Sequence, residues 1–302
     1  MTFAGTGLVL GAALSVQFGS AVATLLFPRA GAAGIVALRL AIAAIVLLVV
    51  CRPRLRGLRR GDWLVAAGFG AAMAGMNGLF YQAIDRIPLG PAVTLEVLGP
   101  LTLAVVTARR RSGWLWAGLA LAGVLLLGYQ GFDRLNAAGA AFALGAGAMW
   151  AAYIVFSARA GRRFPKADGL ALALAAGALL TLPFGIAGAG AALLNPATLA
   201  LGAVVALLSS VLPYTMELLA LRRLPTSTFA VLMSLGPAIA VLAGFLVLDQ
   251  RLSPPELLAV ALVIAASAGA VRTPPPVATA SPAPPTIPAS PPPPVTAATR
   301  PH

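Results

Sequence analysis

The stretch TLEVLGPLTLAVV, residues 94–106, is an apolar run that contains a single carboxylate and a Gly-Pro pair. Glu96 precedes Gly99 and Pro100 by only a few residues. A charged side chain at the centre of a membrane helix costs about 2.5–3.5 kcal/mol on insertion scales, so it needs a partner or a water-filled cavity. Proline removes a helix hydrogen bond, and such a break is tolerated in a membrane helix where neighbouring groups satisfy the freed backbone. The stretch therefore predicts a membrane helix that carries a buried acid beside a Gly-Pro kink.

The rest of the chain has the same apolar character. Of its 302 residues, 60% are hydrophobic and 10% are charged, whereas a soluble domain has about 25% charged residues. The net charge is +13, but the arginines stand in short clusters between apolar runs, which is typical of a membrane protein and not of a nucleic-acid interface. One cysteine, Cys51, and one histidine, His302, leave no internal disulfide and no Cys- or His-based metal site. We expect no metal, no cofactor, no nucleic-acid partner and, without a catalytic constellation, no enzyme.

An apolar stretch of about 20 residues can cross the hydrocarbon core as a helix. The sequence contains ten such stretches and predicts an all-α membrane protein with ten transmembrane helices. We expect the helices at 5–27, 32–51, 62–84, 90–108, 113–131, 137–158, 168–188, 198–221, 226–248 and 254–272. Residues 273–302 are rich in proline and alanine and are expected to form a disordered cytoplasmic tail.

The arginines predict the orientation. The loops after the even-numbered spans contain RPRLRGLRR, RRR, RAGRRFPK and RR, whereas each loop after an odd-numbered span contains at most one arginine. Positively charged residues concentrate in cytoplasmic loops. The alternation through all ten spans therefore predicts that both termini face the cytoplasm.

Two segments of the chain resemble each other. RIPLGPAVTLEVLGPLTLAVV, residues 86–106, and RLPTSTFAVLMSLGPAIAVLA, residues 223–243, agree at six positions, among them Gly99-Pro100 and Gly236-Pro237. Five predicted crossings separate the segments, and because five is odd, the two copies run in opposite directions. Such inverted repeats are typical of secondary transporters, whose substrate site lies between the halves near the midplane. We expect one five-helix repeat over 1–131 and a second over 137–272.

Four polar side chains are predicted to share one layer of the first repeat. Arg39 and Glu96 each stand about seven residues from the outer end of their spans, hence about 10 Å deep at a rise of 1.5 Å per residue. Asn77 lies at a similar depth, and Gln17 is slightly deeper. Two interpretations remain open: a structural Arg39–Glu96 ion pair completed by the amides, or a cavity in which the four bind substrate and Glu96 exchanges a proton.

Other positions also have two interpretations. Gly99, Pro100, Gly236 and Pro237 are either packing kinks or hinges of a gate, and these roles are compatible. Glu217, near the inner end of its span, is either a snorkelling residue paired with the following loop arginines or part of an inner gate. In the second half Trp150, Tyr153, Ser209, Ser210 and Ser234 lie at the midplane, where they could pack or form the wall of a cavity.

Four stretches carry a resemblance to a known family: GAAGIVALRLAIAAIVLL, GMNGLFYQAIDRIPLGPAVTLEVLGPL, ALGAGAMWAAYIVFSARAG and LPYTMELLALRRLPTSTFAVLMS. They resemble the EamA family of the drug/metabolite transporter superfamily, and within it the bacterial inner-membrane threonine/homoserine exporters. The resemblance implies ten helices in two inverted repeats and places Arg39, Asn77, Glu96 and Glu217 at recurrent polar positions. Relatives often have a glutamate where this chain has Gly236, and Gly-Glu where it has Asp249-Gln250.

The resemblance implies proton-driven export of small neutral amino acids across the bacterial inner membrane. A zwitterion needs one cation and one anion, so Arg39 could bind the carboxylate and deprotonated Glu96 the ammonium. The expected partners are a small-molecule substrate, protons and the lipid bilayer. Two alternatives remain: efflux of a cationic drug or metabolite through Glu96, and a membrane sensor or scaffold without flux.

Overall fold

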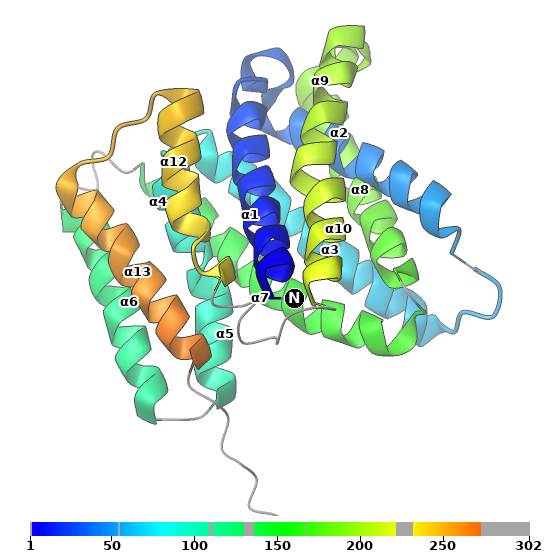
Figure 1. Ribbon diagram of the computed structural model, residues 1–302. Helices are drawn as coiled ribbons and strands as arrows, with labels where there is room; N and C mark the ends of the chain where they lie inside the picture. Colours follow the sequence, from blue (N-terminus) through cyan, green and yellow to red (C-terminus); the bar gives the residue numbers. More distant parts are fainter. Residues whose placement is uncertain are drawn as a thin grey trace, which may run out of the picture.

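The computed structural model describes residues 2–53, 55–108, 111–129, 136–165, 167–221 and 232–272, and in these ranges the ordered elements are helices, with no strand (Figure 1). The first part of the chain contains α1 (Thr2–Thr24), α2 (Phe27–Cys51), α3 (Arg60–Ile84), α4 (Leu89–Glu96), α5 (Leu98–Ala108) and α6 (Arg111–Tyr129). The second part contains α7 (Ala137–Arg163), α8 (Asp168–Ala189), η1 (Gly190–Leu194), α9 (Pro196–Ala206), the π-helical turn η2 (Leu207–Val211), α10 (Leu212–Leu221), α12 (Gly236–Leu248) and α13 (Pro254–Arg272).

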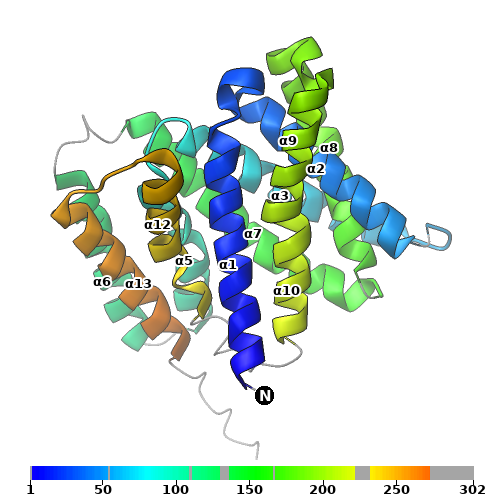
Figure 2. The same cartoon turned by 45° about the horizontal axis from the view of Figure 1, so that its top comes forward.

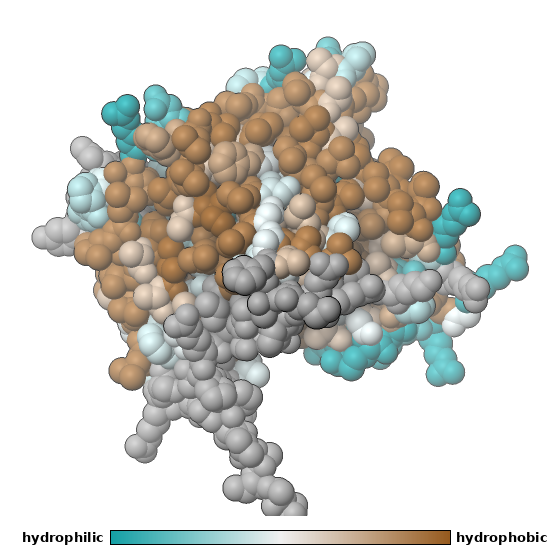
Figure 3. Space-filling model, in the orientation of Figure 1, coloured by the Kyte–Doolittle hydropathy of each residue, from teal (hydrophilic) through white to brown (hydrophobic). Residues whose placement is uncertain are grey.

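Many of these helices suit a membrane. Seven described helical segments are long and apolar enough to cross one: Ala4–Thr24, Phe27–Cys51, Arg60–Ile84, Leu89–Thr107, Ala137–Arg163, Asp168–Leu194 and Pro196–Glu217. Three shorter apolar helices, Trp114–Leu126, Gly236–Leu248 and Pro254–Ala270, lie in the remaining predicted spans. Figure 3 shows a broad apolar surface with hydrophilic residues gathered toward its ends. The chain is thus a multi-pass membrane protein, and the count of ten crossings stays a prediction.

Two predicted spans are interrupted. The span predicted at 90–108 is split at Val97 between α4 and α5, and the span at 198–221 contains the π-helical turn η2. The start of the span predicted at 226–248, and the predicted tail at 273–302, lie outside the described residues. A turn at Ser234 and Leu235 precedes α12. The breaks at Val97 and Ser234 occupy matching positions of the two similar segments, three residues before Pro100 and Pro237.

The helices form two groups in space, joined by α1 and α7 (Figures 1 and 2). One group contains α4, α5, α6, α12 and α13, and the other contains α2, α3, α8, α9 and α10. Each group draws helices from both parts of the sequence. The two halves of the sequence are therefore interleaved and do not form separate bundles.

The packing partners nevertheless follow a regular scheme. In this scheme α7 corresponds to α1, α8 to α2, and α9 with α10 to α3. The contact of α3 with α7 then corresponds to that of α10 with α1, and the contact of α3 with α8 corresponds to that of α9 with α2. α4 and α5 pack on α7 as α12 packs on α1. The pairs α2–α8, α4–α12 and α6–α13 each join corresponding helices. Exchanging the first five predicted spans for the last five thus leaves the main contacts unchanged.

Small residues permit the closest crossings. At the contact of α3 with α8, a Cβ on Gly70 would lie 2.6 Å from the carbonyl oxygen of Ala173. At the contact of α5 with α7, a Cβ on Gly99 would overlap the carbonyl group of Gly147. Lipid offers no hydrophobic drive for helix association, so close backbone approach through such residues is a main source of stability.

The start of α4 packs tightly against α12 and is capped by a residue that follows α12. Where α4 begins, a Cβ on Gly90 would lie 2.6 Å from Cγ2 of Val241 near the middle of α12, and the Leu89 N–H donates to Oε1 of Gln250 at 3.0 Å. Pro88, the N-cap residue of α4, provides no side-chain cap. Gln250 therefore caps a helix from 161 positions away in sequence and joins α4 to α12 at the end of the fold opposite the N-terminus.

Candidate substrate-binding cavity

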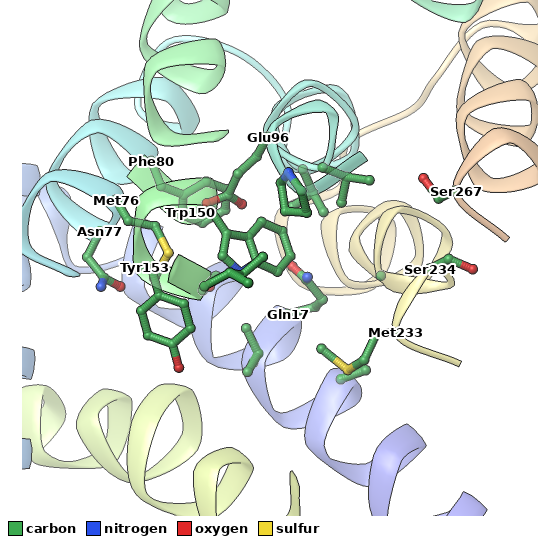
Figure 4. A pocket seen from close by; sticks show the side chains of 18 of the residues that line it. Gln17, Met76, Asn77, Phe80, Glu96, Trp150, Tyr153, Met233, Ser234 and Ser267 are labelled. Atoms are coloured by element: carbon green, nitrogen blue, oxygen red, sulfur yellow. The ribbon is translucent and has the colours of Figure 1, made fainter. Parts of the chain in front are cut away.

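A cavity of about 390 Å³ lies between the two groups of helices, with walls that include α1, α3, α4, α7 and α12. Small-molecule sites commonly enclose about 300–1,000 Å³. Most of its lining is apolar or aromatic, including Phe80, Val93, Trp150 and Ile154. Polar side chains occur at a few points of the wall, and Figure 4 shows Gln17, Asn77, Glu96, Ser234 and Ser267 among them. An apolar pocket with few polar groups is typical of a site that orients a small ligand.

All four residues of the predicted polar layer line this one cavity. Gln17 comes from α1, Arg39 from α2, Asn77 from α3 and Glu96 from the last position of α4. Their exposed fractions are 8%, 5%, 3% and 8% in that order. Residues distributed over the first hundred positions thus meet around one cavity.

Glu96 lies at the break between α4 and α5. Pro100 has no N–H to donate to the Glu96 carbonyl, and this carbonyl packs against Gly147, where a Cβ would lie only 2.5 Å from the oxygen. The helix break and the glycine contact fix the backbone that carries the acid. In Figure 4 the Glu96 side chain extends toward Trp150.

The Glu96 carboxylate interacts with the charge of Arg39 at a distance but has no direct partner within the described part of the chain. It makes no hydrogen bond there, and no cationic nitrogen lies within 4 Å of it, so the Arg39–Glu96 ion pair, one of the two predicted alternatives, is absent. Because Glu96 lines the cavity, a bound cation, a proton or water can satisfy it, as the other alternative requires.

Arg39 is bound on three sides instead. Its Nε donates to the Ser210 hydroxyl at 3.0 Å, its Nη2 to the Ser209 carbonyl at 2.7 Å, and its Nη1 to the Tyr81 hydroxyl at 3.2 Å. The guanidinium carbon also lies 5.6 Å from the centre of the Tyr81 ring. Arg39 on α2 is thus joined to α3 and, across the interface, to the π-helical turn η2.

Pro213 explains why the Ser209 carbonyl is available. In a regular helix the N–H of residue 213 would donate to this carbonyl, but proline has no N–H. The chain responds with the π-helical turn, in which the Leu212 N–H donates to the Leu207 carbonyl. Ser15 Oγ on α1 donates to the neighbouring Leu208 carbonyl at 2.6 Å. Side chains from α1 and α2 therefore satisfy the carbonyls at this interruption, a kind of feature frequent at functional sites.

Several buried oxygens near the cavity have no hydrogen-bond partner in the described structure: Gln17 Oε1, Ser20 Oγ, Ser209 Oγ and Ser267 Oγ. All four residues belong to the cavity lining. An unpaired buried polar group costs about 1–3 kcal/mol. These residues lie on α1, η2 and α13, and a conformation that admitted water or substrate beside them would relieve the cost.

The other predicted positions divide between the wall and the packing around it. Trp150, Tyr153, Ser209, Ser234 and Glu217 line the cavity, whereas Ser210 contacts Arg39. The cavity position of Glu217 favours the gate interpretation over snorkelling, and the loop arginines proposed as its partners lie outside the described residues. Of the candidate hinges, Pro100 and Gly236 line the cavity, Gly99 packs on Gly147, and Pro237 is buried.

Sequence reasoning missed Tyr81, Ser20 and Ser267. Tyr81 is fully buried, and its hydroxyl contacts Arg39. It stands four positions after Asn77 and therefore one turn away on the same face of α3, a signal that was present in the sequence. Ser20 and Ser267 carry no such signal, since a serine in a membrane helix is common. Among the described residues, no group of three or more His, Cys, Asp or Glu is placed to hold a metal ion.

Known proteins resemble the chain in sequence. Residues 137–272 match the EamA-like transporter family. The threonine/homoserine exporter RhtA of Escherichia coli (strain K12) is 41% identical over 268 residues, which cover 88% of this chain and 90% of the relative. RhtA of Salmonella typhimurium (strain LT2) is 41% identical over 261 residues, covering 86% and 88%. The uncharacterized transporter YwfM of Bacillus subtilis (strain 168) is 28% identical over 227 residues, covering 72% and 77%.

A solved crystal structure has a similar fold, with a TM-score of 0.56 at 22% identity, covering 88% of this chain and 96% of the other. It supports the arrangement of helices alone. The similarity to the exporters is stronger, because it combines 41% identity with coverage of nearly the whole of both chains. At this identity and coverage, the chain belongs to the EamA-like transporter family.

Proposed function

We propose that this protein exports small neutral amino acids, of the threonine or homoserine kind, across the bacterial inner membrane by proton-coupled alternating access. The relatives that are 41% identical are named threonine/homoserine exporters. The observation that carries the proposal is the position of Glu96: a buried acid without a protein partner among the described residues, in the lining of a cavity that Arg39 also lines. Opposite charges in one cavity suit a zwitterion.

The proposed architecture is two inverted five-helix repeats, 1–131 and 137–272, with both termini in the cytoplasm. The exchange symmetry of the helix contacts supports the repeats, and the matching breaks at Val97 and Ser234 support them further. The arginine-rich loops support the orientation. The end of the fold that carries the N-terminus is then cytoplasmic, and the end where Gln250 caps α4 is periplasmic.

In the proposed cycle, Arg39 binds the carboxylate of the amino acid and ionised Glu96 binds its ammonium group. A proton from the periplasm then neutralises Glu96, which weakens the attraction for the ammonium and releases the amino acid. The proton leaves toward the cytoplasm, and the ionised acid can bind again. One proton enters for each amino acid that leaves, so the proton gradient drives export.

The contacts of α4 and α12 are consistent with a state closed to the periplasm. The two helices pack tightly where Gln250 meets Leu89. Toward their other ends the cavity lies between them, with Val97 and Pro100 on one side and Ser234 and Gly236 on the other. Alternating access would require these two ends to exchange roles.

Uptake into inside-out vesicles tests the proposal. Vesicles with an acidic interior should accumulate labelled threonine or homoserine when they contain the protein, and collapse of the proton gradient should abolish accumulation. A panel of small amino acids would define the substrate. Accumulation of no amino acid, or accumulation that does not depend on the proton gradient, would contradict the proposal.

A second candidate is export of a cationic compound through the same cavity. It is favoured by the unpaired Glu96 beside the aromatic walls Trp150 and Tyr153, since aromatic rings attract cations. This candidate does not need a carboxylate-binding group. A cation without a carboxylate should then be transported equally well after Arg39→Ala, whereas transport of a zwitterion should fall.

A further inference from the structure

We infer that Tyr81 and Ser210, together with the main-chain carbonyl of Ser209, are positioning groups that hold Arg39 for the carboxylate of the transported amino acid. This inference rests on the proposed function and adds the residues on which recognition of the carboxylate depends. It also assigns a role to the π-helical turn η2, which sequence reasoning did not foresee.

The hydrogen-bond capacity of Arg39 supports the inference. A guanidinium group has five N–H donors and no acceptor. One donor each on Nε, Nη1 and Nη2 is occupied by Ser210, Tyr81 and the Ser209 carbonyl. One donor therefore remains on each of the two terminal nitrogens. Such a pair matches the two oxygens of a carboxylate, which arginine often binds in bidentate fashion.

The three supporting groups are themselves rigid. Tyr81 has no exposed surface, and its ring lies 5.7 Å from the ring of Phe27 and 6.1 Å from that of Phe80. Ser209 and Ser210 are each 1% exposed and belong to the π-helical turn. A long arginine side chain has many rotamers, and fixing them beforehand reduces the entropy lost when a ligand binds.

Pro213 is the reason that the Ser209 carbonyl needs a donor such as Arg39. Without a donor from residue 213, the Ser209 carbonyl would be buried and unpaired unless another group reached it. Arg39 supplies the missing donor at 2.7 Å. The proline, the π-helical turn and the arginine thus form one unit, in which a helix interruption in the second half of the chain fixes a charged side chain of the first half.

The arrangement also links substrate binding to movement of the halves. α2 and α3 come from the first half of the chain, whereas η2 comes from the second, and Arg39 is bonded to both α3 and η2. A carboxylate bound by Arg39 is therefore connected to both halves of the chain. We expect substrates with a carboxylate to affect the interface of α2 with η2 more than substrates that lack one.

Binding to purified protein tests the inference without requiring transport. The probes are L-threonine and L-threoninol, in which an alcohol replaces the carboxylate. Tyr81→Phe removes one hydroxyl and keeps the ring, and Ser210→Ala removes the other hydroxyl. Each variant should raise the Kd for threonine about threefold to tenfold, the range expected for one hydrogen bond, and change the Kd for threoninol less than about twofold.

Matched variants separate positioning from general damage to the cavity. Tyr153→Phe and Ser267→Ala remove the same hydroxyls from other parts of the lining, and neither hydroxyl receives a hydrogen bond from Arg39. They should leave the ratio of the two Kd values unchanged. Arg39→Lys should raise the ratio of the Kd for threonine to the Kd for threoninol more than Tyr81→Phe or Ser210→Ala does, because an ammonium group cannot replace the bidentate fork of arginine.

Two results would overturn the inference. If wild-type protein discriminates threonine from threoninol but Tyr81→Phe and Ser210→Ala leave the Kd ratio unchanged, these residues do not position Arg39. If the matched variants change the ratio equally, the effect belongs to the cavity as a whole. Failure of the proposed function has a different signature, in which wild-type protein binds neither probe, and that result removes the inference as well.

Discussion

The two Gly-Pro pairs of this protein have the same sequence and different surroundings. At Gly99 the backbone of α5 meets the backbone of α7, and no room remains for a side chain beside the Gly147 carbonyl. At Gly236 the atom nearest to an added Cβ would be Nε2 of Gln17, 3.9 Å away. Gly99 is a close packing contact, whereas Gly236 lines the cavity.

This difference shows how similar halves can produce an asymmetric state. In a symmetric structure the two glycines would be equally packed, and the cavity would not lie beside Gly236 alone. If the protein alternates between two states, the surroundings of Gly99 and Gly236 should exchange between them. A repeat in the sequence thus leads to an expectation about movement.

The largest expected effect is that of Gly99→Ala. The new methyl group would overlap main-chain atoms of Gly147, which cannot move aside as a flexible side chain can. Overpacking of this kind costs about 1–3 kcal/mol, occasionally more. We expect a clearly lower thermal unfolding temperature in detergent and little transport. An unfolding temperature equal to that of the wild type would show that the close contact does not exist.

A smaller effect is expected for Gly236→Ala, the matched change in the second half. The free space beside Gly236 should keep stability within about 0.5 kcal/mol of the wild type. Transport should nevertheless fall several-fold, because the alternate state would press this position against a neighbouring helix. Wild-type transport rates in Gly236→Ala would indicate that the two pairs do not exchange roles.

The smallest effect is expected at the closed end, where Gln250 caps α4. Gln250→Leu removes the acceptor of the Leu89 N–H. The population of molecules that are open at this end should rise about threefold to tenfold, the range expected for the loss of one hydrogen bond. The measurement is labelling of Val93→Cys by a membrane-impermeant thiol reagent in whole cells, on a Cys51→Ser background. Val93 lines the cavity and is 2% exposed.

A local helix cap provides the control for Gln250→Leu. The Asn195 side chain accepts from the N–H of Ala197 and caps α9, which begins at the same end of the fold (Figure 1). Asn195→Ala removes a cap of similar strength without affecting the contact of α4 with α12. Equal labelling in both variants would show that Gln250 acts only as a local stabiliser.

The meeting of the polar residues around one cavity can be predicted from the sequence. Counting residues from the loops places Gln17, Arg39, Asn77 and Glu96 in one layer, and the structure puts all four around one cavity. Counting works because a helix rises by a constant 1.5 Å per residue and the membrane fixes where each helix starts. The break beside Glu96 is also expected, since Pro100 stands in the sequence.

The partners of Arg39 cannot be predicted in this way. Ser209 and Ser210 lie 170 and 171 positions further along the chain, so their contact with Arg39 depends on how α2 packs against the second half. The interleaving of the halves cannot be predicted either, because apolar helices that face lipid and helices that face protein have similar compositions. Pro213 is a usable signal for the freed carbonyl, but only the fold shows which donor reaches it.

The most direct test of the account is whether Glu96 couples protons to the amino acid. In proteoliposomes with a pH-sensitive dye inside, a threonine gradient across wild-type protein should drive protons in the opposite direction. Glu96→Gln, which keeps the shape but cannot ionise, should bind and exchange threonine more weakly and should move no protons. A folded Glu96→Gln protein that moves protons with threonine at the wild-type ratio would contradict the account.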